Sequence, residues 1–273
     1  MDKKEESKIE KIEKAPDSLA EVSEGLQKIL KDIEIIEKVI DGTDIEDAKA
    51  KVQKEKEVEK EEQEQESQDK GKKESQDKGK KESENKTESQ NKEKPIEKDE
   101  KLLKQWEKVD KKIKEVHEKW NIYQPESVKK GVTTDKTDKF GESINSLAKS
   151  IEMRNIKDIY NFGSESMLNL KPIFDLYLDE IKGDTNKLKY ITYQSYLKFI
   201  DDKVTQSVSL LNEAPEDIQK IKLKLEKKDS KIEILDKLEL SIRDMSKSLK
   251  LNSINLIRIK KDIIIKNLEE LDK

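Results

Sequence analysis

The 273-residue sequence contains no cysteine. This absence excludes disulfide bonds, thiolate catalysis and zinc sites with cysteine ligands. The single histidine, His117, cannot form an ordinary multi-histidine metal site, and we expect it to be a partly exposed or packed imidazole. The sequence also lacks glycine-rich phosphate loops and the carboxylate spacing of a calcium loop. It therefore predicts a protein that is not an enzyme and that holds no metal ion or cofactor.

Long apolar runs and an excess of basic charge are absent as well. No window approaches the roughly 18–20 apolar residues that a membrane span needs. The 58 basic residues are balanced by 62 acidic ones, giving a net charge of −4, and only Arg154, Arg243 and Arg258 are arginines. A nucleic-acid-binding protein usually has a basic excess or patch. We therefore expect a solvated, mixed-charge surface and no nucleic-acid partner.

The composition is too polar for one compact globule of this length. Charged residues make up 44% of the chain, hydrophobic residues 32% and aromatic residues 4%. An average soluble domain is about 25% charged. We therefore expect segments with a core pattern to be joined by a segment without one.

The N-terminal part predicts a disordered stretch over 1–16 followed by a helical hairpin or coiled-coil segment over 17–58. Ser18 and Glu21 form a capping box, and apolar residues then recur every three or four positions over 19–40, about three heptads. Gly42 is a natural helix end, and a weaker stripe follows to Val52. The first stripe indicates either an amphipathic helix docked on its own domain or a two-helix or intermolecular coiled coil.

A spacer over 59–95 has nothing to bury. From Glu59 to Lys94 there is no valine, isoleucine, leucine, methionine, phenylalanine, tyrosine or tryptophan. Within this segment ESQDKGKK occurs twice in tandem, at 66–73 and 74–81. Such a segment cannot offset a backbone entropy cost of about 1–2 kcal/mol per residue. We predict a disordered tether that sets the reach between its neighbours.

The helical spacing returns over 96–273, where we predict a bundle of about five helices and no strands. Apolar stripes run over 102–120, 140–160 and 167–181. The third is apolar on most sides, which is typical of a central helix, and Gly163 is expected to end the second. The predicted fold class is all-α.

Two further stripes complete the predicted bundle. One runs from Leu188 to about Asn212, and Pro215 with two acidic residues then begins a new helix. The other runs over 235–271 and predicts a long final helix. The polar residues 227–230 leave open whether that helix is continuous from 226.

An aromatic cluster provides the only candidate partner-binding residues. Tyr190, Tyr193, Tyr196 and Phe199 recur at a spacing of three on the predicted helix from Leu188 onward. They either pack in the core or form a partly exposed recognition surface, since tyrosine is a frequent interface anchor. The spacing alone leaves both interpretations open.

The sequence resembles the plasmid-encoded surface lipoproteins of Borrelia-type spirochaetes in four features. They are the lysine-rich composition, the ESQDKGKK repeats, the helical module over 97–273 and the N-terminus MDKKEESKIEK, which has no apolar leader. The resemblance implies a non-enzymatic outer-membrane lipoprotein that binds host proteins, such as complement, plasma or matrix components, in immune evasion or adhesion. Its only membrane attachment would be a lipid anchor on a cysteine that this sequence lacks. The alternative is a cytoplasmic coiled-coil scaffold that self-associates through the stripes at 19–40 and 235–271.

Overall fold

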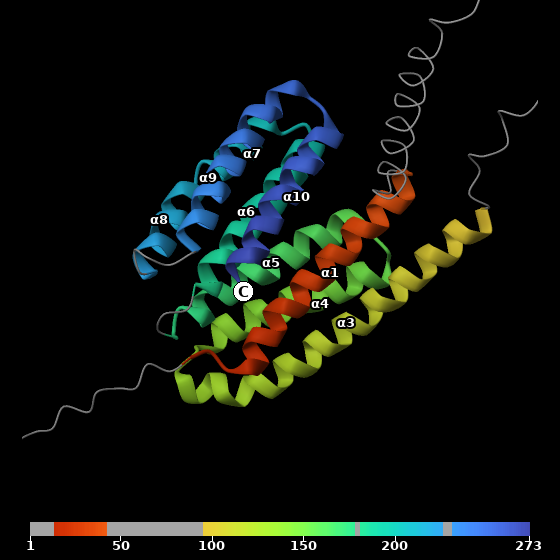
Figure 1. The fold of residues 1–273 in the computed structure, drawn as a ribbon. Coiled ribbons are helices and arrows are strands. Elements are labelled where there is room, and N and C mark those ends of the chain that lie inside the picture. The colour runs from red at the N-terminus through yellow and green to blue at the C-terminus, as the bar shows by residue number, and fades with distance from the viewer. Residues whose placement is uncertain (1–13, 43–94, 178–180, 226–230) are drawn as a thin grey trace, which may run out of the picture. The chain divides into compact units, whose positions relative to one another are not determined.

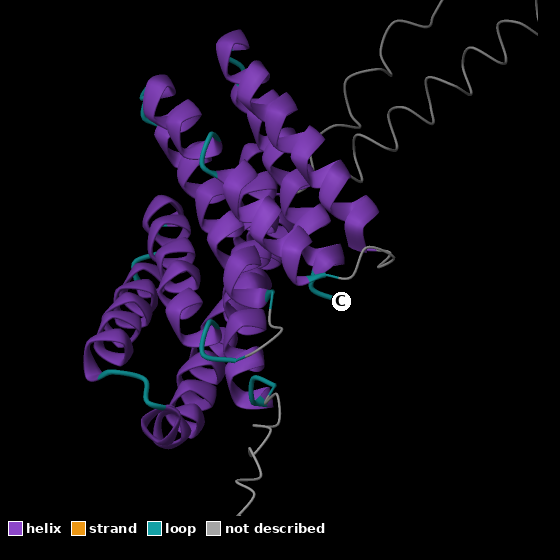
Figure 2. Cartoon of the chain, turned by 90° about the vertical axis from the view of Figure 1, so that its left-hand side faces the viewer, coloured by secondary structure: helices purple, strands orange, loops and turns teal. Residues whose placement is uncertain are grey.

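The structure is a computed structural model that describes residues 14–42, 95–177, 181–225 and 231–273. Within these residues every regular element is a helix (Figures 1 and 2). The prediction of an all-α helical bundle is therefore confirmed. The expected second helix of the N-terminal hairpin, at 43–58, and nearly all of the expected spacer over 59–95 lie outside the described residues.

The chain divides into two compact units, one formed by Met1–Lys31 and Val109–Lys273 and the other by Asp32–Lys108. In the smaller unit the ammonium group of Lys98 donates to the backbone carbonyl of Ile40 at 3.0 Å. The buried side-chain contacts and the pocket described below lie in the larger unit, whereas α1 and α3 each have residues in both units. The elements are α1 (Asp17–Asp41), α3 (Pro95–Lys130), α4 (Thr134–Glu152), α5 (Ile156–Phe174), α6 (Lys182–Ile200), α7 (Val204–Leu211), α8 (Ala214–Lys224), α9 (Lys231–Ser248), the 3₁₀ turn η1 (Leu249–Leu251) and α10 (Ile254–Leu271).

Helix α6 is the central helix of the larger unit. It contacts α5, α7, α8 and α10, and most of its residues are buried. Its buried residues include polar ones such as Asp184, Asn186 and Lys189, so its sequence is not markedly apolar. The expectation that the stripe over 167–181 forms the central helix is therefore wrong.

Three predicted helices are interrupted by single residues in the left-handed conformation. Arg154 (φ 55°) separates α4 from α5, Asp202 (φ 57°) separates α6 from α7, and Asn252 (φ 48°) separates η1 from α10. Apolar spacing continues on both sides of each turn, so periodicity alone does not reveal them. As a result the bundle has more and shorter helices than the predicted set of about five.

The long final helix expected over 235–271 is a helical hairpin instead. Asn252 reverses the chain, and the Ser253 side chain then accepts a hydrogen bond from the Leu256 amide to begin α10. Asp244 pairs with Lys260, and the Asn267 amide donates to the Ser241 hydroxyl, which places α9 and α10 antiparallel. Asparagine tolerates a left-handed backbone better than most residues, so this turn needs no glycine.

The first half of α1 belongs to the bundle. Its apolar stripe is buried, and the Ser23 hydroxyl donates to the Asn186 side-chain carbonyl of α6 at 3.0 Å. Helix α5 approaches α1 at Gly163, where an added Cβ would lie 2.6 Å from Cδ2 of Leu30. Gly163 is thus an interior residue of α5 rather than its end. Of the two interpretations of the 19–40 stripe, docking on its own domain fits the part of α1 up to Lys31, which lies in one unit with Val109–Lys273.

The close approach at Gly163 predicts a difference between two glycine substitutions. Gly141→Ala on α4 has open space for its Cβ, and it should raise the free energy of unfolding by up to about 1 kcal/mol because alanine favours helix. Gly163→Ala gains the same propensity but must displace Leu30, at a typical overpacking cost of about 1–3 kcal/mol. Urea denaturation of the full chain should therefore find G163A less stable than G141A. Equal stabilisation by both substitutions would contradict the docking of α1 on α5.

Candidate functional site

The four predicted aromatic residues lie on α6, but most are not accessible. Tyr193, Tyr196 and Phe199 are only 1%, 0% and 3% exposed, whereas Tyr190 is half-buried. The Tyr160 ring of α5 stacks on Tyr193, with ring centroids 5.5 Å apart. The prediction of a partner-binding surface is therefore wrong for Tyr193, Tyr196 and Phe199, because the central position of α6 places them in the core.

The aromatic cluster surrounds a lysine of the chain itself. Lys261 of α10 is fully buried, and its ammonium nitrogen lies 5.3–5.4 Å from the ring centroids of Tyr160, Tyr193 and Tyr196. A desolvated cation–π contact contributes about 2 kcal/mol or more. The same nitrogen is 2.8 Å from the Asp262 carboxylate. The cage thus joins α10 to α5 and α6.

A second buried lysine joins α6 to α1 and to the end of α10. Lys189 is 1% exposed and donates to the Gln27 side-chain carbonyl at 2.6 Å and to the Asp272 carboxylate at 2.5 Å. Asp272 also accepts from the Thr185 hydroxyl at 2.7 Å. Removing an ammonium group from water costs several kcal/mol unless it is paired. The C-terminal end of α10 is therefore coupled to the central helix.

A buried carboxylate has the corresponding role at the start of α6. Asp184 is 1% exposed and accepts from Lys171 of α5 and Lys224 of α8, both at 2.7 Å. Burial raises the pKa of Asp184, but the two ammonium groups lower it by more, so that pKa lies below its usual value. Asp184 is therefore ionised at neutral pH and connects three helices.

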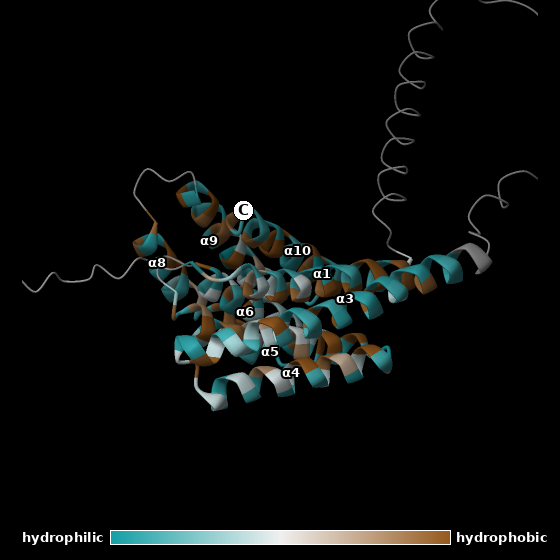
Figure 3. Cartoon of the chain, turned by 90° about the horizontal axis from the view of Figure 1, so that it is seen from below, coloured by the Kyte–Doolittle hydropathy of each residue, from teal (hydrophilic) through white to brown (hydrophobic). Residues whose placement is uncertain are grey.

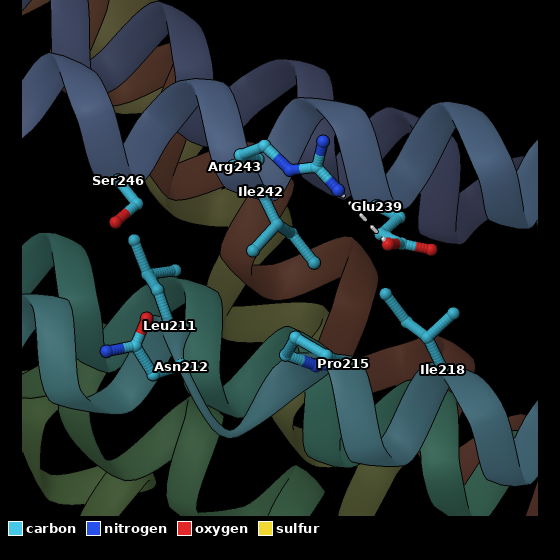
Figure 4. A pocket seen from close by; sticks show the side chains of 8 residues that line it. All are labelled: Leu211, Asn212, Pro215, Ile218, Glu239, Ile242, Arg243 and Ser246. Carbon is cyan, nitrogen blue, oxygen red and sulfur yellow. Dashed lines mark hydrogen bonds and ion pairs between the residues drawn. The ribbon is translucent and has the colours of Figure 1, made fainter.

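One candidate for an external ligand site is a pocket where α7 ends and α8 packs against α9 (Figure 4). Its cavity volume is about 190 Å³. Three of its lining residues, Leu211, Ile218 and Ile242, are apolar and buried, and we call them the floor. The polar lining residues are exposed or partly exposed, and we call them the rim: Asn212, Glu239, Arg243 and Ser246. Exposed Pro215 completes the lining. We call it the α8–α9 pocket.

Exposed aliphatic side chains are concentrated on the same helices. Half of the large hydrophobic residues that are exposed in the described part of the chain lie on α8, α9, η1 and α10. Figure 3 shows both hydrophobic and hydrophilic residues along these helices. We use the name α8–α10 surface for these exposed residues together with the α8–α9 pocket, since α8 and α9 also supply most of the residues that line the pocket. The exposed residues are Leu223, Leu240, Leu251, Ile254, Ile259 and Ile263.

The sequence stripes did not reveal this surface. Leu211 and Ile242 are 31 positions apart in the sequence and line one pocket only because α7 and α9 pack together. A signal was present in α10, where Ile259 and Ile263 lie one helical turn apart on a face other than that of buried Ile257 and Ile264. A surface helix buries only one apolar face, so apolar residues on a second face indicate either exposed apolar surface or a contact with another molecule.

The remaining titratable groups do not assemble a further site within the described residues. No cluster of three or more histidine or carboxylate side chains there could hold a metal ion. His117 is half-buried on α3, and burial lowers its pKa. None of the described helices combines the length and the hydropathy that crossing a membrane requires.

Comparison with known proteins provides no relative. Neither protein-family models, nor curated protein sequences, nor solved structures give a match to this chain.

The buried ion pair of Lys189 predicts an unequal cost for two aspartate truncations. Asp272→Ala leaves a buried ammonium with only Gln27, and it should lower the free energy of unfolding by about 3–5 kcal/mol. Asp244→Ala breaks the exposed pair with Lys260 and should cost less than about 1 kcal/mol. Urea denaturation of the full-length variants measures both costs. Equal effects would contradict the coupling, whereas partial recovery in the double variant Lys189→Met/Asp272→Ala would support it.

The buried carboxylate predicts a change in acid stability. Because the folded pKa of Asp184 is lowered, its contribution is present above the unfolded value of about 3.9 and is lost as the pH falls through the folded pKa. Asp184→Asn should therefore destabilise the protein at pH 7 and flatten the loss of stability below about pH 4. Urea midpoints measured from pH 7 to pH 2 test this, with Asp135→Asn on the surface of α4 as control. A difference in urea midpoint between D184N and wild type that stays constant from pH 7 to pH 2 would contradict the stabilising role of the ionised Asp184 carboxylate.

Proposed function

We propose that this chain is a non-enzymatic bacterial surface lipoprotein that binds a host protein through the α8–α10 surface, in immune evasion or adhesion. The observation that carries the proposal is that half of the exposed large hydrophobic residues in the described part of the chain lie on α8, α9, η1 and α10, two of which, α8 and α9, also supply most of the α8–α9 pocket. Contiguous exposed apolar surface rimmed by polar groups is typical of protein-interaction sites. The host-protein class follows from the resemblance of the sequence to spirochaete surface lipoproteins.

The interior of the bundle supports a binding role rather than catalysis. The buried ionisable groups Lys189, Lys261 and Asp184 are each held by partners within the chain. They are covered by helices and do not converge on an open cleft. The α8–α9 pocket, by contrast, presents apolar carbon and a polar rim, which suits noncovalent recognition of a side chain.

The alternative, a cytoplasmic scaffold that self-associates through coiled coils, is less favoured. Its interface would use the stripes at 19–40 and 235–271. Leu19, Val22 and Leu26 of the first, and Leu235 and Leu238 of the second, are already fully buried within the chain. A coiled coil through these positions would require α1 or α9 to leave the bundle.

The proposal predicts that two exposed residues control capture of a serum protein. Full-length chain carrying Leu240→Glu and Ile263→Glu should lose capture of its partner by tenfold or more, since charged groups on an apolar contact surface would have to be desolvated on binding. Affinity capture from serum followed by mass spectrometry, with surface plasmon resonance on the recovered protein, measures this.

The control is Val128→Glu, which changes an aliphatic residue on α3 that is more exposed than either Leu240 or Ile263. Capture should survive this change. Equal capture by wild type, the L240E/I263E variant and V128E would overturn the assignment of the surface, and capture of no host protein by wild type would overturn the function.

A further inference from the structure

The geometry points to the chemistry of the segment that the α8–α9 pocket binds, an inference that rests on the proposed function. We infer that the pocket accepts one apolar side chain of an acidic, amphipathic partner helix, and that a carboxylate one helical turn from that side chain pairs with Lys247. The partner is thus defined by an apolar anchor and an acidic residue three or four positions apart.

The size and lining of the pocket set the anchor. An apolar protein cavity of about 150 Å³ is large enough to hold a benzene ring. The α8–α9 pocket, at about 190 Å³ and with an apolar floor, therefore has room for one phenyl or branched aliphatic group. Its floor residues Leu211, Ile218 and Ile242 are themselves buried, so the anchor would meet a formed surface.

The charges around the pocket favour an acidic partner because the local carboxylates are already paired. Glu239 accepts from both Arg243 and Lys222, each at 3.3 Å. Asp244 is paired with Lys260 across the hairpin. An incoming cation would find these carboxylates occupied and would be repelled by their partners.

Lys247, in contrast, has no carboxylate partner among the described residues. It is exposed on α9, and no hydrogen bond or ion pair to it occurs within the described residues. It lines a shallow hollow with Leu240 and Asp244, and Arg243 borders both that hollow and the α8–α9 pocket. A carboxylate is the group that complements this arrangement.

The spacing of these groups sets the geometry of the partner. Arg243 and Lys247 are four residues apart and lie on one face of α9, so they are separated by one helical turn of about 5.4 Å. An anchor beside Arg243 and a carboxylate at Lys247 therefore need a similar separation. Positions i and i+3 or i+4 of an amphipathic helix provide it.

Three small probes that share a phenyl ring on a three-carbon chain and differ in the charge of the terminal group test the inference on the full-length chain. They are 3-phenylpropionate, its neutral amide 3-phenylpropanamide, and the cation 3-phenylpropylammonium, each titrated while amide chemical shifts of α8 and α9 are recorded by NMR. We expect all shifts to centre on Ile242, Ser246 and Lys247. The carboxylate should bind about two- to fivefold more tightly than the amide, as expected for one exposed ion pair, and the cation more weakly than both.

Two variants separate the anchor from the charge. Lys247→Gln should remove the preference for the carboxylate and leave the amide affinity unchanged, whereas Lys237→Gln, on the same helix but paired with Glu233, should change neither. Ser246→Phe, which places a ring at the pocket rim, should abolish binding of all three probes.

The outcomes distinguish this inference from the function on which it rests. Equal affinities for the three probes, or a preference that survives K247Q, would overturn the acidic partner and leave the serum-capture test of the α8–α10 surface unaffected. The absence of any shift at the pocket would overturn the pocket as the anchor site. A dimer in wild type that becomes a monomer in S246F, measured by sedimentation, would show that a second copy occupies the pocket and would also overturn the inference.

Discussion

The burial of charged groups on the central helix is the constraint on which the rest of this structure depends. Lys189 and Asp184 occupy positions of α6 that water hardly reaches. Each can remain ionised only if neighbouring helices bring partners, and those partners come from α1, α5, α8 and the end of α10. Apolar packing stabilises the bundle without direction, whereas these pairs also fix which helix lies beside which.

The same constraint separates the interior from the surface that is free to bind. Tyr193 and Tyr196, two of the tyrosines that suggested a recognition surface, instead contact Lys261 and so help to hold α10. What α8, α9 and α10 leave outside is a pocket with an apolar floor and exposed aliphatic residues such as Leu240 and Ile259. Binding at this surface would not require the buried ion pairs to open.

Three- and four-residue spacing was enough to predict an all-α chain, because it reports which positions face a core. It could not predict where helices end, since Arg154, Asp202 and Asn252 adopt left-handed backbone without being glycine. Nor could it identify the central helix, because the buried Asp184 and Lys189 look like surface residues until their partners are known. The α8–α9 pocket was missed because its walls come from helices that only tertiary packing brings together.

Native-state hydrogen exchange of the full-length chain tests the central role of α6 most directly. If the paired charges of α6 hold the bundle together, the amides of α6 should exchange slowest among the described helices and should open only with global unfolding. Their exchange should then show the full urea dependence of the unfolding transition. Exchange of α6 amides as fast as those of the peripheral helix α8, or through openings that urea does not promote, would contradict the account.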